Sequence, residues 1–373
     1  MNARRILHTL FTGLLAVWAL ASCIDDELVK NNNVVEGVPI TMTMKLAGAP
    51  TADVTVETRA SGNDLSTLSN LTIYVYDGNG KYQQTVSTLD GTLERVSGPT
   101  GTTDVTYEVK FSTTSGTKKL LAVGNPGASW WGKSVTELDA SNLSFEELKK
   151  KLMTLAYTKN SDGEISTPIT ITASDQMLIS GWNEGIVFDT KGNVSQWGDS
   201  SYPVAVHMKR SMAEITFNIN GNDKFTPTSY KVYNVPTNAY VANMEGSNID
   251  ESVVFNHFAS SIVQTSESGT PYFRFYMPEN IYDRVDGVGT DYQNRDKWGA
   301  TTEEGYPLGK KWTNAPKTAT FVVISGTYSG KATVDKVEKD VTANVEYTVH
   351  LGDFSDNGAM SDFSVKRNVS YTY

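Results

Sequence analysis

Nine residues near the amino end of the chain alternate between apolar and polar side chains. The stretch reads VPITMTMKL, and its apolar members are Val38, Ile40, Met42, Met44 and Leu46. A period of two is typical of a β-strand with one buried face, because successive side chains point to opposite sides of the sheet. The pattern therefore predicts a β-sheet protein in which this strand is well suited to the core.

The residues before this strand have the features of an export signal. Two arginines precede an apolar run, Leu10–Ala21, which is short for a membrane-spanning helix of about 20 residues. The end of the run, Leu20–Cys23, resembles the lipobox of bacterial lipoproteins, in which the signal (residues 1–22) is removed and the cysteine is acylated. We expect Cys23 to carry lipid and to attach the protein to the outer membrane. The alternative is an ordinary signal peptide that contains a cysteine.

Composition and charge limit the function further. The formal net charge is −10, and loss of the leader with its two arginines makes it −12. Such a surface repels nucleic acid, so we expect no nucleic-acid partner. Cys23 is the only cysteine, which excludes an intramolecular disulfide and a multi-cysteine zinc site.

Strand-like segments recur along the rest of the chain. They are Thr72–Tyr76, Val105–Phe111, Lys119–Gly124, Val204–Met208, Ala213–Ile219, Ser229–Val235, Pro271–Met277, Ala319–Gly326, Asn344–Leu351 and Asp362–Tyr373. One helix is predicted over residues 145–156, because Ser144 and Glu147 form a capping box. A polar loop, Gly185–Tyr202, marks a domain boundary. The sequence predicts an all-β chain of two tandem antiparallel β-sandwich domains with one short inserted helix.

The last segment repeats the pattern of the first strand. It reads DFSVKRNVSYTY over Asp362–Tyr373, with Arg367 as the one interruption of the apolar face. That face consists of Phe363, Val365, Val369, Tyr371 and Tyr373. The alternation is still running at the last residue, so the strand either completes its own domain or is unfinished.

The search for catalytic or metal-binding residues is negative. The four histidines, His8, His207, His257 and His350, lack the spacing of a metal site, and no nucleophile elbow or phosphate-binding loop occurs. We expect no enzymatic activity, no cofactor and no metal. Trp130, Trp131 and the stretch Asp291–Trp298 are aromatic loop residues that either bind glycans or pack a domain edge.

Several stretches, taken together and in order, resemble the fimbrillin superfamily, the subunits of type V fimbriae of Bacteroidetes. They are Cys23, Arg59, AVGNPG (Ala122–Gly127), VHMKRSMAEITFNI (Val206–Ile219), SYKVYNVP (Ser229–Pro236), FRFYMPEN (Phe273–Asn280) and the C-terminal part Tyr347–Tyr373. The resemblance covers nearly the whole chain, and it does not distinguish stalk, tip and anchor subunits.

The resemblance implies a transthyretin-like, Greek-key form of the two sandwiches and a strand-exchange assembly. A trypsin-like or arginine-specific protease would cut between Arg59 and Ala60 and release a lipidated propeptide, residues 23–59, that contains the first strand. The domains would then be residues 60–200 and 201–373. A neighbouring fimbrial subunit would fill the vacated groove with its own donor strand, Asp362–Tyr373, in a homo- or heteropolymer on the cell surface with a role in adhesion.

Physical reasoning from the residues supports this scheme and leaves rivals open. An empty strand position exposes apolar sites and unpaired backbone groups, which only another alternating strand satisfies together. A head-to-tail contact of this kind builds a filament. Alternatively, Val38–Leu46 is a permanent strand and Arg59 an ordinary loop residue. The protein is then a monomeric surface lipoprotein that binds a glycan or a host ligand.

Overall fold

The chain folds almost entirely into β-strands, as expected from the alternating pattern. The computed structural model describes residues 34–48, 52–55, 68, 70–97, 106–125, 138–154, 161, 178–219, 224–236, 238–242, 257–258, 263–264, 272–304, 306–334, 336–354 and 360–373. Within them it contains one short α-helix, α2 (Phe145–Lys149), and two 3-10 turns, η2 (Tyr292–Asn294) and η3 (Pro307–Gly309). None of the helices in these ranges is long and apolar enough to cross a bilayer.

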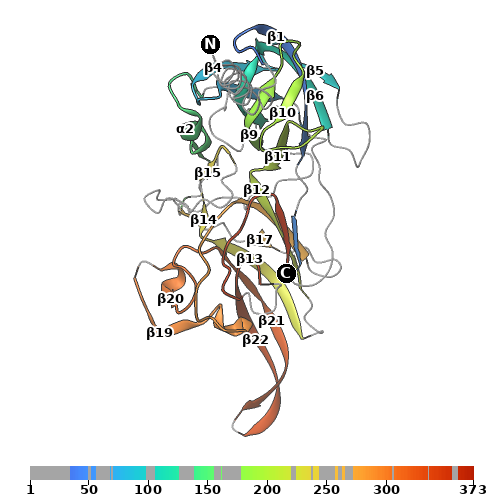
Figure 1. Ribbon diagram of the computed structural model, residues 1–373. Coiled ribbons are helices and arrows are strands. Elements are labelled where there is room, and N and C mark those ends of the chain that lie inside the picture. Colours follow the sequence, from blue (N-terminus) through green and yellow to red (C-terminus); the bar gives the residue numbers. More distant parts are fainter. Residues whose placement is uncertain are drawn as a thin grey trace, which may run out of the picture.

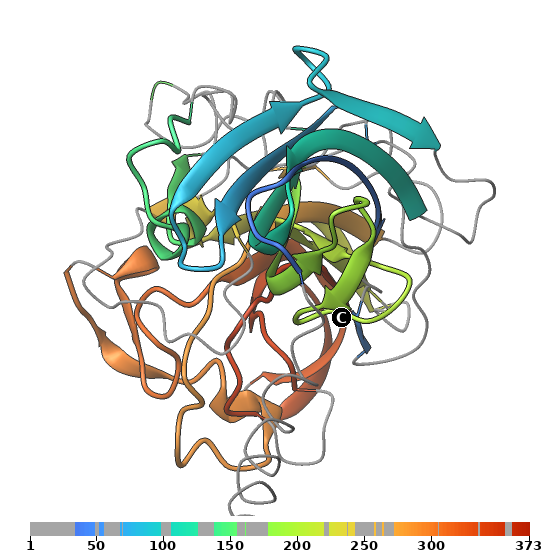
Figure 2. The same cartoon turned by 45° about the horizontal axis from the view of Figure 1, so that its top comes forward.

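A nine-stranded sheet forms the upper half of the molecule in Figure 1 and curves strongly in the view of Figure 2. Its order is β4-β3-β7-β9-β11-β1-β6-β5, with β10 paired to β9. The bounds are β1 (Pro39–Gly48), β3 (Leu71–Asp77), β4 (Tyr82–Ser87), β5 (Leu93–Ser97), β6 (Thr106–Thr114), β7 (Gly116–Gly124), β9 (Ile179–Phe188), β10 (Val194–Trp197) and β11 (Val206–Arg210).

Smaller sheets form the lower half of the molecule. Two have four strands, in the orders β18-β12-β23-β2 and β17-β13-β21-β22, and three are pairs, β14-β16, β15-β8 and β19-β20. The bounds are β2 (Ala52–Thr55), β8 (Leu152–Thr154), β12 (Met212–Asn218), β13 (Phe225–Tyr233), β14 (Val235–Pro236), β15 (Asn238–Tyr240), β16 (His257–Phe258), β17 (Val263–Gln264), β18 (Tyr272–Pro278), β19 (Trp298–Thr302), β20 (Lys310–Trp312), β21 (Phe321–Val334), β22 (Val337–His350) and β23 (Val369–Thr372).

The chain crosses from the large sheet to a four-stranded sheet twice, with similar geometry. β11 lies in the large sheet and β12, which begins one residue later beyond the buried Ser211, lies in the smaller one. β1 and β2 make the same crossing: β1 runs parallel to β11 in the large sheet, and β2 lies in the four-stranded sheet of β12. The expectation that Val204–Met208 begins the second sheet is therefore wrong. The reason is that Val206 and Met208 pack into the core of the large sheet.

The helix is shorter than the sequence predicts. The capping box of Ser144 and Glu147 is confirmed, but α2 ends at Lys149, and β8 follows where the helix was expected to continue. The backbone carbonyls of Lys149 and Lys151 accept hydrogen bonds from Ala242 and Val241. β8 then pairs with β15. Tertiary pairing thus replaces the later turns of the predicted helix.

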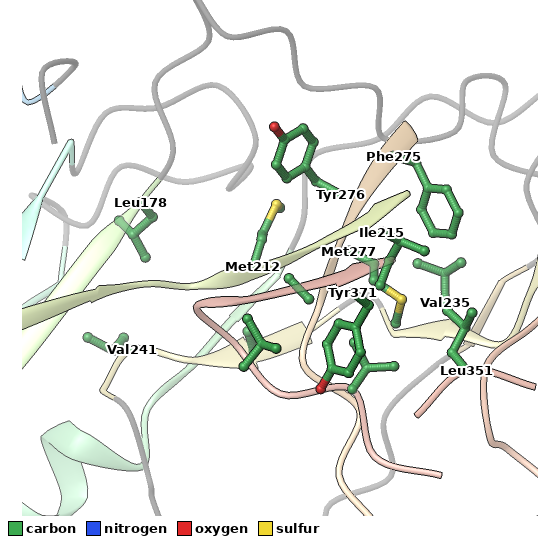
Figure 3. Close-up of a cluster of buried hydrophobic side chains, with 14 of the residues drawn as sticks. Leu178, Met212, Ile215, Val235, Val241, Phe275, Tyr276, Met277, Leu351 and Tyr371 are labelled. Atoms are coloured by element: carbon green, nitrogen blue, oxygen red, sulfur yellow. The ribbon is translucent and has the colours of Figure 1, made fainter. Parts of the chain in front are cut away.

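One hydrophobic cluster joins the two halves of the molecule. Figure 3 shows part of it, with Leu178 from the segment before β9, Ile215 from β12 and Tyr371 from β23. Tyr76 and Leu121 from the outer face of the large sheet belong to the same cluster. A second cluster fills the inner side of the large sheet. The two halves are therefore packed on a continuous core.

Candidate functional site

The strand β1 lies inside the large sheet, between β6 and β11. It pairs antiparallel with β6 from Pro39↔Thr114 to Ala47↔Thr106, which is nearly its whole length. It pairs parallel with β11 only at its end, from Leu46↔Val206 to Gly48↔Met208. Removal of β1 would therefore separate β6 from β11 and open the sheet.

The predicted alternation of β1 is present in the structure. Ile40, Met42, Met44 and Leu46 are buried, and the threonines and the lysine between them are exposed. Val38 precedes the strand and is half-buried, so it contributes less than the sequence pattern indicates. Burial of four such side chains contributes about 6–12 kcal/mol as an upper figure.

Short contacts hold β1 at both of its ends. The N–H of Val38 donates to Ser115 Oγ over 3.1 Å, and the N–H of Ser115 donates to the Val38 carbonyl over 2.8 Å. At the other end the N–H of Ala205 donates to the Lys45 carbonyl over 2.7 Å. Gly192 packs over the strand, where a Cβ atom would lie 2.2 Å from the Thr41 carbonyl oxygen. These contacts fix the register of β1.

The strand β2 continues the same N-terminal segment into the smaller sheet. It pairs parallel with β23, from Ala52↔Val369 to Thr55↔Thr372. Figure 1 shows it as a short blue arrow beside the C-terminus. β2 is not among the strands that the sequence predicts, because ADVT is too short to show a period and its partner lies more than 300 residues away in sequence.

The C-terminal segment Asp362–Tyr373 differs from the predicted amphipathic strand. Regular strand structure is confined to β23, because Asn368 adopts a positive φ of 58° that interrupts the extended backbone. The segment is also buried on both sides. The buried set contains the expected apolar residues Phe363, Val365, Val369 and Tyr371, and also the polar residues Asp362, Ser364, Arg367, Asn368 and Thr372.

This segment is held by backbone pairing and side-chain hydrogen bonds within its own chain. β23 lies between β12 and β2, and Val365 exchanges two backbone hydrogen bonds of 2.8 Å with Asn280. The Tyr373 hydroxyl donates to the Gly352 carbonyl over 2.9 Å and accepts from the Gly352 N–H over 2.9 Å. The buried Arg367 donates to the Tyr240 carbonyl and to the Glu279 carboxylate. In this structure the segment predicted to act as a donor therefore lies in a sheet of its own chain, between β12 and β2.

Arg295 holds the start of the C-terminal segment. Its guanidinium is only 1% exposed and donates to the carbonyls of Met360 (2.7 Å) and Asp362 (2.9 Å). It also donates to the carbonyls at the end of β22, those of His350 (3.4 Å) and Leu351 (2.9 Å). The guanidinium carbon lies 4.2 Å from the ring centroid of Phe363. One side chain thus joins β22 to the segment that leads into β23.

His350 lies beside this arginine in an aromatic surrounding. Its ring contacts Trp312, Phe321 and Phe363 at centroid distances of 4.7, 5.1 and 5.9 Å. Nδ1 lies 2.6 Å from the Asp296 carboxylate. Burial lowers the pKa of His350 despite this carboxylate, because desolvation disfavours the imidazolium form.

This lowered pKa predicts a loss of stability in mild acid. Unfolded His350 binds a proton near pH 6.5, whereas the folded side chain binds one only at lower pH, so protonation favours unfolding. We expect the free energy of unfolding to fall below about pH 6.5, by at most about 1.4 kcal/mol per pH unit from this residue. Urea titrations between pH 5 and 7.5 should show a weaker dependence in His350→Gln. The exposed His207→Gln is the control and should follow the wild type; an unchanged slope in His350→Gln would contradict the assignment.

The stretch Asp291–Trp298 combines buried and exposed residues. Arg295 is buried as described, and Trp298 is 42% exposed with Lys310 Nζ 5.0 Å from its ring centroid. Asp291, Gln293 and Lys297 are exposed as well, so Arg295 is the one residue of the stretch that the structure describes as buried. The described residues contain no group of histidine, cysteine, aspartate or glutamate arranged to hold a metal ion.

Other residues singled out in the sequence lie outside the described part of the chain. They are the lipidation residue Cys23, the processing residues Arg59 and Ala60, and the aromatic pair Trp130 and Trp131. Their roles stay predictions.

Comparison with protein families gives two matches. Residues 40–178 match the major fimbrial subunit protein family, FimA, and residues 275–373 match a domain of unknown function, DUF4906. The first match confirms the resemblance to fimbrillins, and it begins within β1. The description of this family is that of a fimbrial subunit. A comparison with curated protein sequences finds no match.

Comparison with solved structures gives distant likenesses. A putative cell adhesion protein from Parabacteroides distasonis is 11% identical, with a TM-score of 0.50 and coverage of 85% of each chain. The tip fimbrial protein Mfa3 from Porphyromonas gingivalis, with a C-terminal truncation, is 15% identical. Its TM-score is 0.48, and the match covers 90% of this chain and 94% of that one. At 11% identity, the likeness to the Parabacteroides distasonis protein concerns the fold alone.

Proposed function

We propose that this chain is a structural subunit of a cell-surface fimbrium assembled by strand exchange. The proposal is supported by the match of residues 40–178 to the FimA family of major fimbrial subunits. The chain is exported as a lipoprotein through Cys23. A trypsin-like or arginine-specific protease then cuts between Arg59 and Ala60. An extended strand from a neighbouring subunit takes the position that β1 occupies before the cut.

The position of β1 is the observation that carries this proposal. β1 is the first strand in the described part of the chain, yet it lies between β6 and β11 and buries its apolar residues in the core of the large sheet. Three residues separate its end from β2, which ends four residues before Arg59. A cut there leaves both strands attached to the rest of the protein only by non-covalent contacts.

The empty position would select one kind of occupant. It offers buried sites for the side chains that replace Ile40, Met42, Met44 and Leu46, and backbone partners along β6. An alternating apolar strand satisfies both requirements, which is the general mode of strand addition to a sheet. Vacating the position costs about 6–12 kcal/mol of apolar burial, so an incoming strand regains a large free energy.

We assign the donor role to the C-terminal segment Asp362–Tyr373, which the family resemblance implies as the donor. Its residues are held between β12 and β2 before assembly, so donation requires that they leave this site. For the domain organisation we propose two transthyretin-like sandwiches after the propeptide 23–59. The passage from the large sheet at Ser211 favours a boundary near this residue instead of 200.

The processing site is tested with one substitution. Purified precursor is treated with an arginine-specific protease, the new N-terminus is sequenced, and assembly is followed by SDS-resistant ladders on gels. We expect a terminus at Ala60 and ladders in the wild type. Arg59→Gln should abolish both, whereas Arg284→Gln, which changes an exposed arginine, should behave like the wild type.

The opposite result would favour the alternative function. If protein isolated from the cell surface carries only the lipidated Cys23 terminus and stays monomeric, strand exchange is wrong. The chain would then be a monomeric surface lipoprotein, and exposed aromatic residues such as Trp298 would be the first positions to test for glycan binding.

A further inference from the structure

Strand β2 covers the outer edge of the strand nearest the C-terminus. β23 pairs with β12 on one side and with β2 on the other, and β2 is the last strand of that sheet. An unpaired strand edge presents free N–H and C=O groups and readily pairs with another chain. β2 therefore occupies an edge that would otherwise be open to association.

The backbone directions identify which groups of β23 are covered. The N–H of Tyr373 donates to the Thr216 carbonyl over 2.9 Å, and the N–H of Asn218 donates to the Tyr373 carbonyl over 2.8 Å. Tyr373 thus faces β12. Because successive residues of a strand direct their backbone groups to opposite edges, Ser370 and Thr372 face β2.

The register likewise identifies the residue of β2 that covers this edge. Val54 is paired with Tyr371, whose backbone groups face β12 like those of Tyr373. In a parallel ladder one member of each pair directs its N–H and C=O to the other strand, and here that member is Val54. The backbone groups of Asp53 then point away from β23.

We propose that β2 is a removable cap on β23, so that one cut after Arg59 uncovers two strand-pairing sites in two different sheets. The cut detaches β1 and β2 together, because both precede Arg59. The large sheet loses an inner strand. As long as β23 has not left its sheet as a donor, it is an edge strand that accepts an extended segment running in the parallel direction of β2. In the uncut chain the cap prevents this pairing. The role of the cut rests on the proposed function, whereas the capping is a property of the uncut chain.

The cap is tested in the uncut, full-length protein by one proline substitution. Val54→Pro removes the N–H group that faces β23, whereas the matched control Asp53→Pro removes one that points away. We expect hydrogen exchange of the Ser370 and Thr372 amides to accelerate at least tenfold in Val54→Pro and to stay at the wild-type rate in Asp53→Pro. Val54→Pro should also associate with itself at increasing concentration in size-exclusion chromatography.

The two proposals fail in different ways. Unchanged exchange at Ser370 and Thr372 in Val54→Pro, equal acceleration in both variants, or a Val54→Pro protein that stays monomeric at every concentration would each overturn the cap. Amides of β6 report whether the large sheet stays folded in the variants. None of these measurements involves protease, so a failure of processing at Arg59 would leave the result on the cap standing.

Discussion

Replacing Arg295 by alanine should lower the free energy of unfolding by about 3–5 kcal/mol. The guanidinium donates to the carbonyls of Met360, Asp362, His350 and Leu351, and Arg295 is only 1% exposed. Alanine leaves these acceptors buried and without their donor, and each unsatisfied group costs about 1–3 kcal/mol before relaxation. The loss is measured by urea denaturation at pH 7, with midpoint and slope compared to the wild type.

Two further variants separate the hydrogen bonds from the charge. Arg295→Lys keeps the positive charge but lacks the planar fork that reaches β22 and the C-terminal segment together, so we expect a smaller loss. Arg284→Ala changes an exposed arginine and should alter the free energy of unfolding by less than about 0.5 kcal/mol. An Arg295→Ala protein as stable as Arg284→Ala would show that the C-terminal segment is held by its apolar contacts alone.

The sequence predicts β1 well because its two faces have different environments. Thr41, Thr43 and Lys45 face water while their neighbours face the core, so composition alternates with the geometry. The C-terminal segment shows the limit of this reasoning. Its alternation has only one interruption, at Arg367. Yet Arg367 and Asn368 are both buried, with distant partners, Tyr240 and Arg210, that a local pattern does not contain.

The parts of the candidate site that sequence does not predict depend on contacts between distant segments. β2 has four residues and acquires its role only through parallel pairing with β23. Arg295 lies in the polar stretch DYQNRDKW, which is typical of a surface loop, and nothing local distinguishes it from an exposed arginine. The helix after Ser144 is predicted correctly at its start, where the cap is local, and wrongly at its end, where β15 competes for the backbone.

The second large effect is expected at Leu46, and it differs between the precursor and the processed protein. Leu46 is fully buried where β1 contacts both β6 and β11. Leu46→Ala should lower the free energy of unfolding of the uncut chain by about 2–5 kcal/mol, from lost transfer energy and the cavity that remains. Thr43→Ala, on the exposed face of the same strand, should be close to neutral.

Comparison of the two forms tests whether β1 leaves after the cut. Cutting alone does not displace a strand, because its backbone pairing and apolar contacts persist until another strand competes for them. If β1 departs, wild-type and Leu46→Ala precursors yield mature proteins with the same free energy of unfolding. Assembly of the cut Leu46→Ala protein should then be at least tenfold faster than that of the wild type, because β1 is bound less tightly and each 1.4 kcal/mol is a factor of ten. If β1 is a permanent strand, the Leu46→Ala deficit persists unchanged after protease treatment and the assembly rate does not respond. Urea denaturation of both forms, together with the rate at which ladders appear, distinguishes these outcomes.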